Sequence, residues 1–190
     1  MLKKISLSIM IIGTFLTLFK NGFSQVKAAN LMEINVSSIA FQKGSTIPLK
    51  YVCDRIPKGK NVSIPLKWAS VPAGTKSFAM YMYDLNPVAK DHIHWFVTNI
   101  PISVTSFNEG ISRTKFMPTG SLEFPNTSGS IGYEGPCPPK GTGNHQYKVV
   151  ILALNVEEFK PSGVTTLANI EASIQGKVLA KGEISGYYQQ

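Results

Sequence analysis

The sequence predicts a mainly β domain built as a β-sandwich, with few short helices. Runs of strand length that are rich in apolar and aromatic residues recur along the chain. Turns separate them, in a chain that carries 16 glycines and 12 prolines. Only one late segment has a helical period. Many short strands with Gly and Pro turns and one late helix are typical of a sandwich.

The N-terminal segment, residues 1–28, predicts a signal peptide. A basic start at Lys3 and Lys4 precedes an uncharged apolar stretch, residues 5–19, and small residues follow at Ala28 and Ala29. The stretch is shorter than the roughly 20 residues that span a membrane. An uncleaved anchor stays open, as does cleavage after Ser24 instead of Ala28. We expect an exported protein, periplasmic or secreted, whose residues 31–190 form a single domain without a transmembrane segment.

Charge and cysteine content narrow the class of partner. Loss of Lys3, Lys4, Lys20 and Lys27 with the signal peptide lowers the formal charge from +8 to +4. That excess suits an anionic ligand, and no Lys/Arg block or recognition helix favours nucleic acid. The two cysteines, Cys53 and Cys137, predict a disulfide in an oxidising compartment, with two buried free thiols as the alternative. A homodimer is left open.

Alternation of side chains predicts the strands. Residues 77–83 and 94–100 carry apolar or aromatic side chains on both faces, which indicates burial between two layers. In the second segment, alternation places His94 with Phe96 on the face opposite Trp95. Residues 147–154 are almost continuously apolar and predict a central strand. Residues 47–52 and 62–68 predict weaker strands interrupted by prolines.

The C-terminal third predicts a helix followed by a strand. Thr165 or Thr166 can cap the helix, an apolar stripe that includes Ile170 and Ile174 forms its inner face, and Gly176 ends it. Residues 177–188 then return as a strand. Residues 103–131, rich in Gly, Ser, Thr and Asn, predict a long surface excursion.

A rigid loop and several strand ends predict a binding site. Residues 132–147 contain three prolines and four glycines, and they lead into His145 and Tyr147 on one side of a strand. Asp84 ends one predicted strand and His94 begins the next, and binding sites gather at such loop-bounded ends. Imidazoles and a phenol could donate to a small phosphate-like anion while the carboxylate orients an imidazole. The predicted ligand-binding residues are Asp84, His94, Pro138, His145 and Tyr147.

The same residues leave an enzymatic alternative. The three histidines, His92, His94 and His145, could bind zinc with one open position. Without metal, His94 or His145 could act as a general base oriented by Asp84 in a hydrolase. No nucleophile elbow or phosphate-cradling loop is present. We therefore expect a binding protein with no cofactor, not an enzyme, and leave the zinc alternative to the resemblance described below. His92 is expected at the rim or surface, and Glu134 at a solvated turn.

The chain resembles the phosphatidylethanolamine-binding protein family, also called the Raf kinase inhibitor family, and looks most like its bacterial branch. The similarity runs from near Phe41 to Tyr188 and follows the family's order of motifs. These are Tyr51-Val52-Cys53-Asp54, Pro65-Leu66-Lys67-Trp68, residues 71–78, His94-Trp95-Phe96-Val97-Thr98-Asn99-Ile100-Pro101 and the Gly135-Pro136-Cys137-Pro138-Pro139 loop.

The resemblance implies a β-sandwich with a small anion pocket that works without metal. Asp84 matches the first acid of the family's Asp-Pro-Asp-x-Pro motif, although the motif here reads Asp84-Leu85-Asn86-Pro87. His94 matches the histidine of the His-Trp strand. His145 and Tyr147 match the His-Arg-Tyr motif, whose arginine is Gln146 here. Family members bind phosphate-bearing head groups, and several are implicated in inhibiting kinases or serine proteases.

Overall fold

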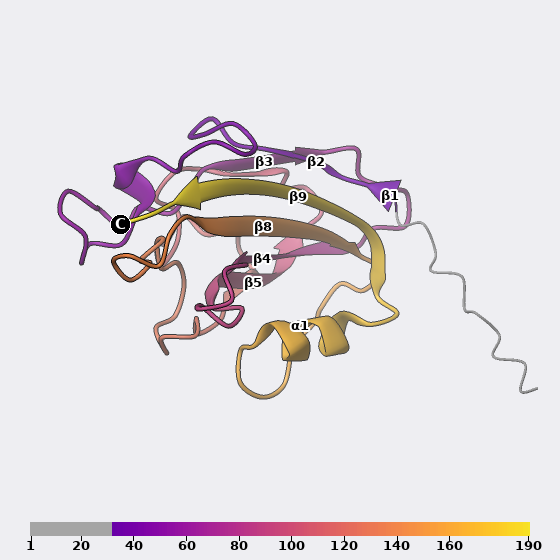
Figure 1. Cartoon of the computed structure of the whole chain (residues 1–190). Helices are drawn as coiled ribbons and strands as arrows, with labels where there is room; N and C mark the ends of the chain where they lie inside the picture. Colours follow the sequence, from indigo (N-terminus) through magenta and orange to yellow (C-terminus); the bar gives the residue numbers. More distant parts are fainter. Residues whose placement is uncertain (1–31) are drawn as a thin grey trace, which may run out of the picture.

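Two β-sheets form the frame of the molecule (Figure 1). The computed structural model describes residues 32–190, so the predicted signal peptide lies outside the described residues. The larger sheet has six strands in the order β1-β9-β8-β4-β5-β7, and the smaller has three in the order β2-β3-β6. The elements are β1 (Met32–Glu33), β2 (Asn35–Ser37), the 3-10 helix η1 (Leu49–Tyr51), β3 (Leu66–Ala69), β4 (Ser77–Asp84), β5 (Ile93–Pro101), β6 (Ser106–Phe107), β7 (Leu122–Glu123), β8 (His145–Leu154), α1 (Leu167–Ile174) and β9 (Val178–Tyr188).

The large sheet is covered on both faces. One face packs against the small sheet, where Trp68 and Phe107 contact residues of β4 and β5 such as Phe78 and Trp95. The other face packs under α1, whose Ile170 belongs to the second apolar cluster (Figure 1). The predicted burial of the β4 segment on both faces and the central place of β8 are confirmed. No helix among residues 32–190 is long and apolar enough to span a bilayer.

The predicted helix and last strand are confirmed. Thr166 is the N-cap of α1, and its hydroxyl accepts a hydrogen bond from the Asn169 N–H at 3.2 Å. Gly176 follows the helix with φ +76°, a backbone conformation that glycine adopts without strain. β9 then pairs with β8 over its length.

Two predicted strands are wrong in whole or part. Residues 47–52 form no strand and contain the helix η1 (Leu49–Tyr51), because Pro48 has no N–H for a ladder and its carbonyl accepts from the Tyr51 N–H. The strand predicted at residues 62–68 begins only at Leu66, after Pro65. The excursion predicted at residues 103–131 is not confined to the surface: it contains β6 and β7, and Phe107 is fully buried within it.

Two irregularities in β5 break the predicted alternation. Met82 pairs with Trp95 and Tyr83 pairs with Ile93, so His94 is the extra residue of a β-bulge. A bulge re-aims side chains, and the His94 ring here packs edge-on against Tyr147 with centroids 5.1 Å apart. His94 therefore shares the face of Trp95, not the opposite face that alternation predicted.

The predicted disulfide between Cys53 and Cys137 is present, with the Cα atoms 5.5 Å apart. It ties the proline loop to the segment after η1. Gly135 is needed beside it, because a Cβ at this position would overlap the backbone of Tyr51 and Val52. The loop therefore lies pressed against that segment, and the bridge holds it there.

Candidate functional site

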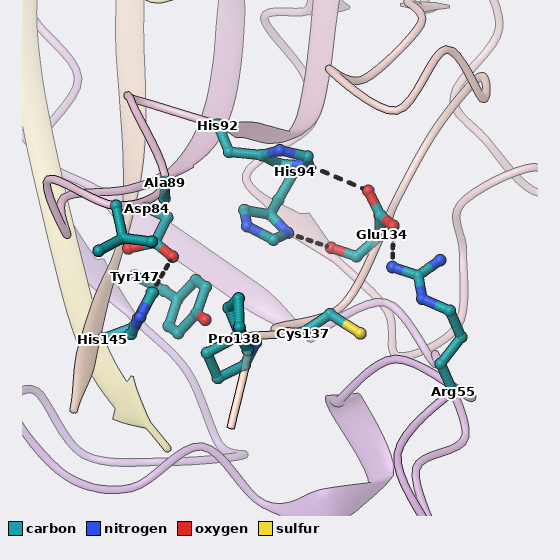
Figure 2. Close-up of a pocket in the computed structure, with 12 residues that line it drawn as sticks. Arg55, Asp84, Ala89, His92, His94, Glu134, Cys137, Pro138, His145 and Tyr147 are labelled. Carbon is teal, nitrogen blue, oxygen red and sulfur yellow. Dashed lines mark hydrogen bonds and ion pairs between the residues drawn. The ribbon is translucent and has the colours of Figure 1, made fainter. Parts of the chain in front are cut away.

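A cavity of about 240 Å³ lies where β4, β5 and β8 meet the proline loop. All five predicted ligand-binding residues line it: Asp84, His94, Pro138, His145 and Tyr147. Arg55, His92 and Glu134 complete the polar wall (Figure 2). Gln146, which lies between His145 and Tyr147 on the strand, does not line the cavity and bonds to Ser185 on β9.

Sheet pairing brings Asp84 and His145 together. Asp84 lies opposite Tyr147 in the antiparallel β4–β8 ladder, and His145 follows on the same face two residues away. The His145 Nδ1 donates to Asp84 Oδ2 at 2.6 Å, and both side chains are almost wholly buried. The other carboxylate oxygen accepts from the Asn86 N–H at 2.8 Å. The Asp84 carboxylate is thus satisfied by the protein itself.

The hydrogen bonds around His145 occupy both of its ring nitrogens. Nδ1 pairs with Asp84, and Nε2 lies 2.9 Å from the Thr142 hydroxyl oxygen. The same hydroxyl is bonded to the Pro139 carbonyl at 2.7 Å. His145 therefore has no ring nitrogen left to bond directly to a ligand.

His94 is the opposite case. Its Nδ1 donates to the Glu134 carbonyl at 2.9 Å, which leaves Nε2 as a lone-pair acceptor. Burial and the neighbouring His92 lower the pKa of His94 to about 4. The ring is neutral above that pH. The sequence predicted that the imidazoles of His94 and His145 donate hydrogen bonds to an anion. In the structure neither ring has an N–H left for a ligand.

The Tyr147 hydroxyl is the free donor of the cavity. The residue is buried, and its hydroxyl oxygen has no hydrogen-bond partner within residues 32–190. Burial, and then the nearby Asp84 carboxylate, raise the pKa of Tyr147, so the proton stays on the oxygen. Buried polar groups are normally paired. The hydroxyl oxygen has almost no exposed surface, so a ligand in the cavity can bond to it only after a small shift of the wall.

Glu134 anchors the far wall, which contradicts its predicted place at a solvated turn. Its side chain is only 9% exposed. The carboxylate accepts from Arg55 at 2.6 Å, from Ser128 at 2.7 Å and from His92 at 3.1 Å. Burial by itself raises the pKa of Glu134, but the bonds from His92, Ser128 and Arg55 outweigh it and lower that pKa. Glu134 is thus ionised, and its charge is neutralised within the wall.

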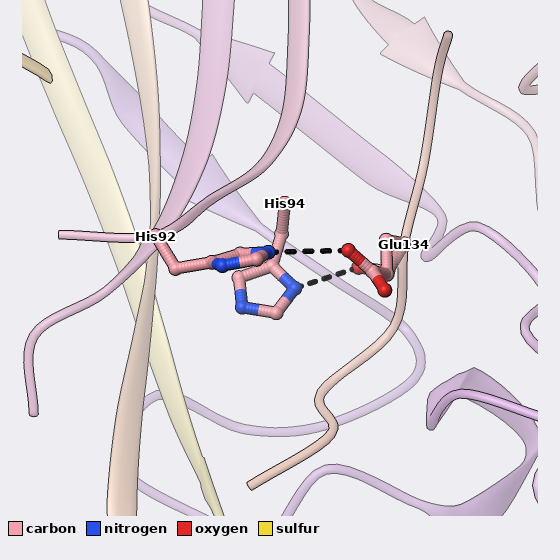
Figure 3. A group of neighbouring side chains, drawn as sticks. All are labelled: His92, His94 and Glu134. Carbon is pink, nitrogen blue, oxygen red and sulfur yellow. Dashed lines mark hydrogen bonds and ion pairs between the residues drawn. The ribbon is translucent and has the colours of Figure 1, made fainter. Parts of the chain in front are cut away.

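The histidines do not assemble as the zinc alternative predicted. Within the described chain, the group with metal-ligand geometry is His92, His94 and Glu134, whose ligand atoms lie within 4.8 Å of one another (Figure 3). His145 is not part of it. Internal hydrogen bonds already engage the Glu134 carboxylate and His94 Nδ1. A cation would have to share the Glu134 carboxylate with Arg55, Ser128 and His92, whereas His94 Nε2 has no hydrogen bond within residues 32–190.

Sequence reasoning missed three contributors to the site. Arg55 lies two residues after Cys53, so the disulfide to Cys137 places it beside the proline loop. Thr142 lies inside that loop and fixes His145. Glu134 stands directly before the Gly135-Pro136 pair, and its burial follows from the tight approach at Gly135. Of these three residues, only Arg55 could have been found from the sequence, because the predicted disulfide places the residues next to Cys53 beside the proline loop.

Comparison with known proteins decides the family. A family model described as phosphatidylethanolamine-binding protein matches residues 37–189. The chain belongs to the phosphatidylethanolamine-binding protein family. A UPF0098 protein of Aquifex aeolicus is 34% identical over 157 residues, which cover 83% of this chain and 89% of that protein. The predicted membership and its bacterial branch are confirmed.

Solved structures agree with the fold. The crystal structure of Escherichia coli YbcL, described as a new member of the mammalian PEBP family, superimposes with a TM-score of 0.75 at 32% identity. The match covers 83% of this chain and 98% of YbcL. LppC of Mycobacterium tuberculosis, whose name refers to a lipoprotein, is 36% identical to this chain over 142 residues. These residues cover 75% of this chain and 66% of LppC. The predicted PEBP-like, mainly β fold is confirmed, with one short α-helix.

Proposed function

We propose that this PEBP-family chain is an exported binding protein that holds a small phosphate-like or carboxylate anion, such as a phospholipid head group, in its cavity. The observation that carries the proposal is the buried Tyr147 hydroxyl, which has no partner within residues 32–190 and lines the cavity. A buried donor left unpaired costs about 1–3 kcal/mol. An anion oxygen bonded to Tyr147 would remove that cost.

The charge balance of the walls supports an anion. Asp84 is hydrogen-bonded to His145 and to the Asn86 N–H, and Glu134 is paired with Arg55, so neither carboxylate repels a ligand at full strength. The Arg55 side chain is 64% exposed at the rim and has donors left to meet an incoming anion. Pro138 and Pro139 contribute apolar surface to the lining. An anion here would bond to donors in a partly dry site, where charge-assisted hydrogen bonds are strong.

The lining supports binding in preference to catalysis. Among the described residues that line the cavity, none is a serine or threonine, and Cys137 is bridged to Cys53. Both ring nitrogens of His145 are engaged by Asp84 and Thr142. His94 Nε2 could accept a proton, but a pKa near 4 makes it a weak base at neutral pH. A hydrolase with His94 as base stays the second candidate on the strength of that free nitrogen.

Export rests on two observations. The disulfide between Cys53 and Cys137 suits an oxidising compartment. The similar protein LppC carries a name that refers to a lipoprotein. We propose a periplasmic or secreted location, and mass spectrometry of the exported protein tests it. An intact Met1 would contradict removal of residues 1–28.

Regulation of a kinase or protease, which the family resemblance implies, would use the cavity mouth. Val88 lines the cavity and is 57% exposed, and Ala89 lies beside it. An apolar, exposed rim next to a polar pocket could seat a partner's chain over the ligand. We propose binding of such a partner at the cavity mouth as a secondary role, and an anion in the cavity would strengthen or block that binding.

Titration calorimetry with inorganic phosphate and phosphoethanolamine tests the binding proposal. We expect saturable binding of at least one of them, with no release of product over the same period. Gln146→Ala is the matched control, because Gln146 belongs to the same strand and does not line the cavity. Absence of binding by phosphate, phosphoethanolamine and acetate, or hydrolysis of a phosphate or carboxyl ester, would overturn the proposal.

A further inference from the structure

His94 presents an acceptor, not a donor, to the cavity. Its Nδ1 is 2.9 Å from the Glu134 carbonyl, and its own carbonyl accepts from the Glu134 N–H at 2.8 Å (Figure 3). These two hydrogen bonds, one from the His94 side chain and one between backbones, hold Glu134 against β5. The proton on His94 Nδ1 therefore has an acceptor in the protein. Nε2 has no hydrogen bond within residues 32–190. The residue is 4% exposed, so bulk water reaches that lone pair only through the cavity.

The neighbouring free group is the Tyr147 hydroxyl. The two rings lie edge to face with centroids 5.1 Å apart, and both line the cavity (Figure 2). No hydrogen bond joins them, and the hydroxyl has no other partner in the described chain. The cavity wall therefore holds one acceptor, His94 Nε2, and one donor, the Tyr147 hydroxyl, which a ligand reaches after a small shift of the wall. Asp84 and Thr142 engage both ring nitrogens of His145, so His145 offers no free N–H.

We propose that, among the anions named above, the cavity prefers those that carry a proton on one oxygen, such as hydrogen phosphate or the monoanion of a phosphate monoester, over carboxylates and the phosphodiester groups of intact phospholipids, which carry none. The ligand's O–H donates to His94 Nε2, and Tyr147 donates to an unprotonated oxygen of the same group. This inference rests on the anion-binding function proposed above and makes His94 the residue that determines specificity. A fully deprotonated anion of the same shape, sulfate, would set an oxygen lone pair against the Nε2 lone pair.

The surroundings of His94 keep it an acceptor. The titratable or charged groups that face it are His92, Glu134, Asp84, Tyr147, His145 and Arg55. Glu134 is bonded to Arg55 and His92, and Asp84 is bonded to His145. Neither carboxylate therefore reaches His94 Nε2 with a free oxygen that would favour the imidazolium. Burial and His92 both favour the neutral ring.

Competition between hydrogen phosphate and sulfate tests the selectivity. The two ions match in shape and, near neutral pH, largely in charge, but only phosphate carries a proton. We expect calorimetry on the full exported protein to give phosphate an affinity about 10- to 100-fold higher, the usual cost of a buried acceptor left unpaired. Equal affinities would overturn this inference and leave the anion-binding function intact. If neither ion bound, and carboxylates and phosphoethanolamine also failed, both proposals would fall.

Two variants separate the acceptor from the donor. His94→Gln offers an amide N–H as well as an oxygen, so sulfate should gain relative to phosphate and the ratio should fall toward one. Tyr147→Phe removes a donor that both ions use, so both should weaken while the ratio is kept. An unchanged ratio in His94→Gln would overturn the role of His94.

The unmodified protein supplies a readout that needs no variant. Methyl phosphate loses its last proton near pH 6, whereas inorganic phosphate keeps one at all pH values up to about 8. We expect the affinity for methyl phosphate to fall above about pH 6 while that for inorganic phosphate changes little. Parallel pH profiles for the two probes would contradict proton recognition, because His145 and Tyr147 act on both alike.

Discussion

Replacement of Tyr147 by Phe should stabilise the free protein and weaken its binding of anions. The hydroxyl is buried, and no partner for it exists in residues 32–190. An unpaired buried hydroxyl costs about 1–3 kcal/mol, so its removal should raise the free energy of unfolding by about 1 kcal/mol. For a domain of this size that corresponds to a rise of about 2–4 °C in Tm. Loss of a donor to the ligand should weaken anion binding by about tenfold.

Tyr133→Phe is the matched control. Tyr133 is as deeply buried, but its hydroxyl donates to the Tyr51 carbonyl at 2.7 Å. Removal of that bond should lower the free energy of unfolding by about 1–2 kcal/mol. Urea unfolding of the wild type and both variants, without added anion, gives the comparison. Equal destabilisation by the two changes would refute the reasoning, because the Tyr147 hydroxyl would then be bonded in solution.

Three further predictions concern pH and stability. Folding lowers the pKa of His94 to about 4 from 6.5, so the unfolded chain binds this proton more readily. The stability that the neutral ring contributes is complete above the unfolded value and is lost as pH falls toward 4, at up to about 1.4 kcal/mol per pH unit. Urea midpoints measured across that window should show a steeper slope for the wild type than for His94→Gln, and identical slopes would contradict the assignment. The double change Cys53→Ser and Cys137→Ser opens a bridge between residues 84 positions apart. This double change should lower the free energy of unfolding, measured with denaturant under oxidising conditions, by about 2–4 kcal/mol. Reduction of the wild-type protein should lower it by about the same amount, and an unchanged free energy in the variant would contradict the prediction. Thr166→Ala should cost about 1 kcal/mol through loss of the α1 cap, whereas Thr165→Ala should cost little; the reverse order in thermal unfolding would place the cap at Thr165.

The local sequence pattern was enough to predict the main strands, the helix α1 and the sheet edge that carries the site. The two-faced apolar runs of β4 and β8 predict their burial, because alternate side chains point to opposite faces whatever surrounds the strand. Strand ends then predict that Asp84, His145 and Tyr147 share one edge, since antiparallel neighbours bring those ends together. The Thr166 cap and Gly176 stop are likewise local, because each acts within one helical turn. The cysteine pair needed only the compartment that the signal peptide indicates.

Tertiary structure decided what the site can do. The bulge at His94 turns the ring onto the Tyr147 face, and no local pattern marks an extra residue in a strand. Which nitrogen of His94 carries a proton depends on the Glu134 carbonyl, 40 residues away in the chain. Whether His145 has a ring nitrogen left for a ligand depends on where the fold places Asp84 and Thr142. Proton positions follow from which partners stand within about 3 Å, and those distances exist only once the chain has folded.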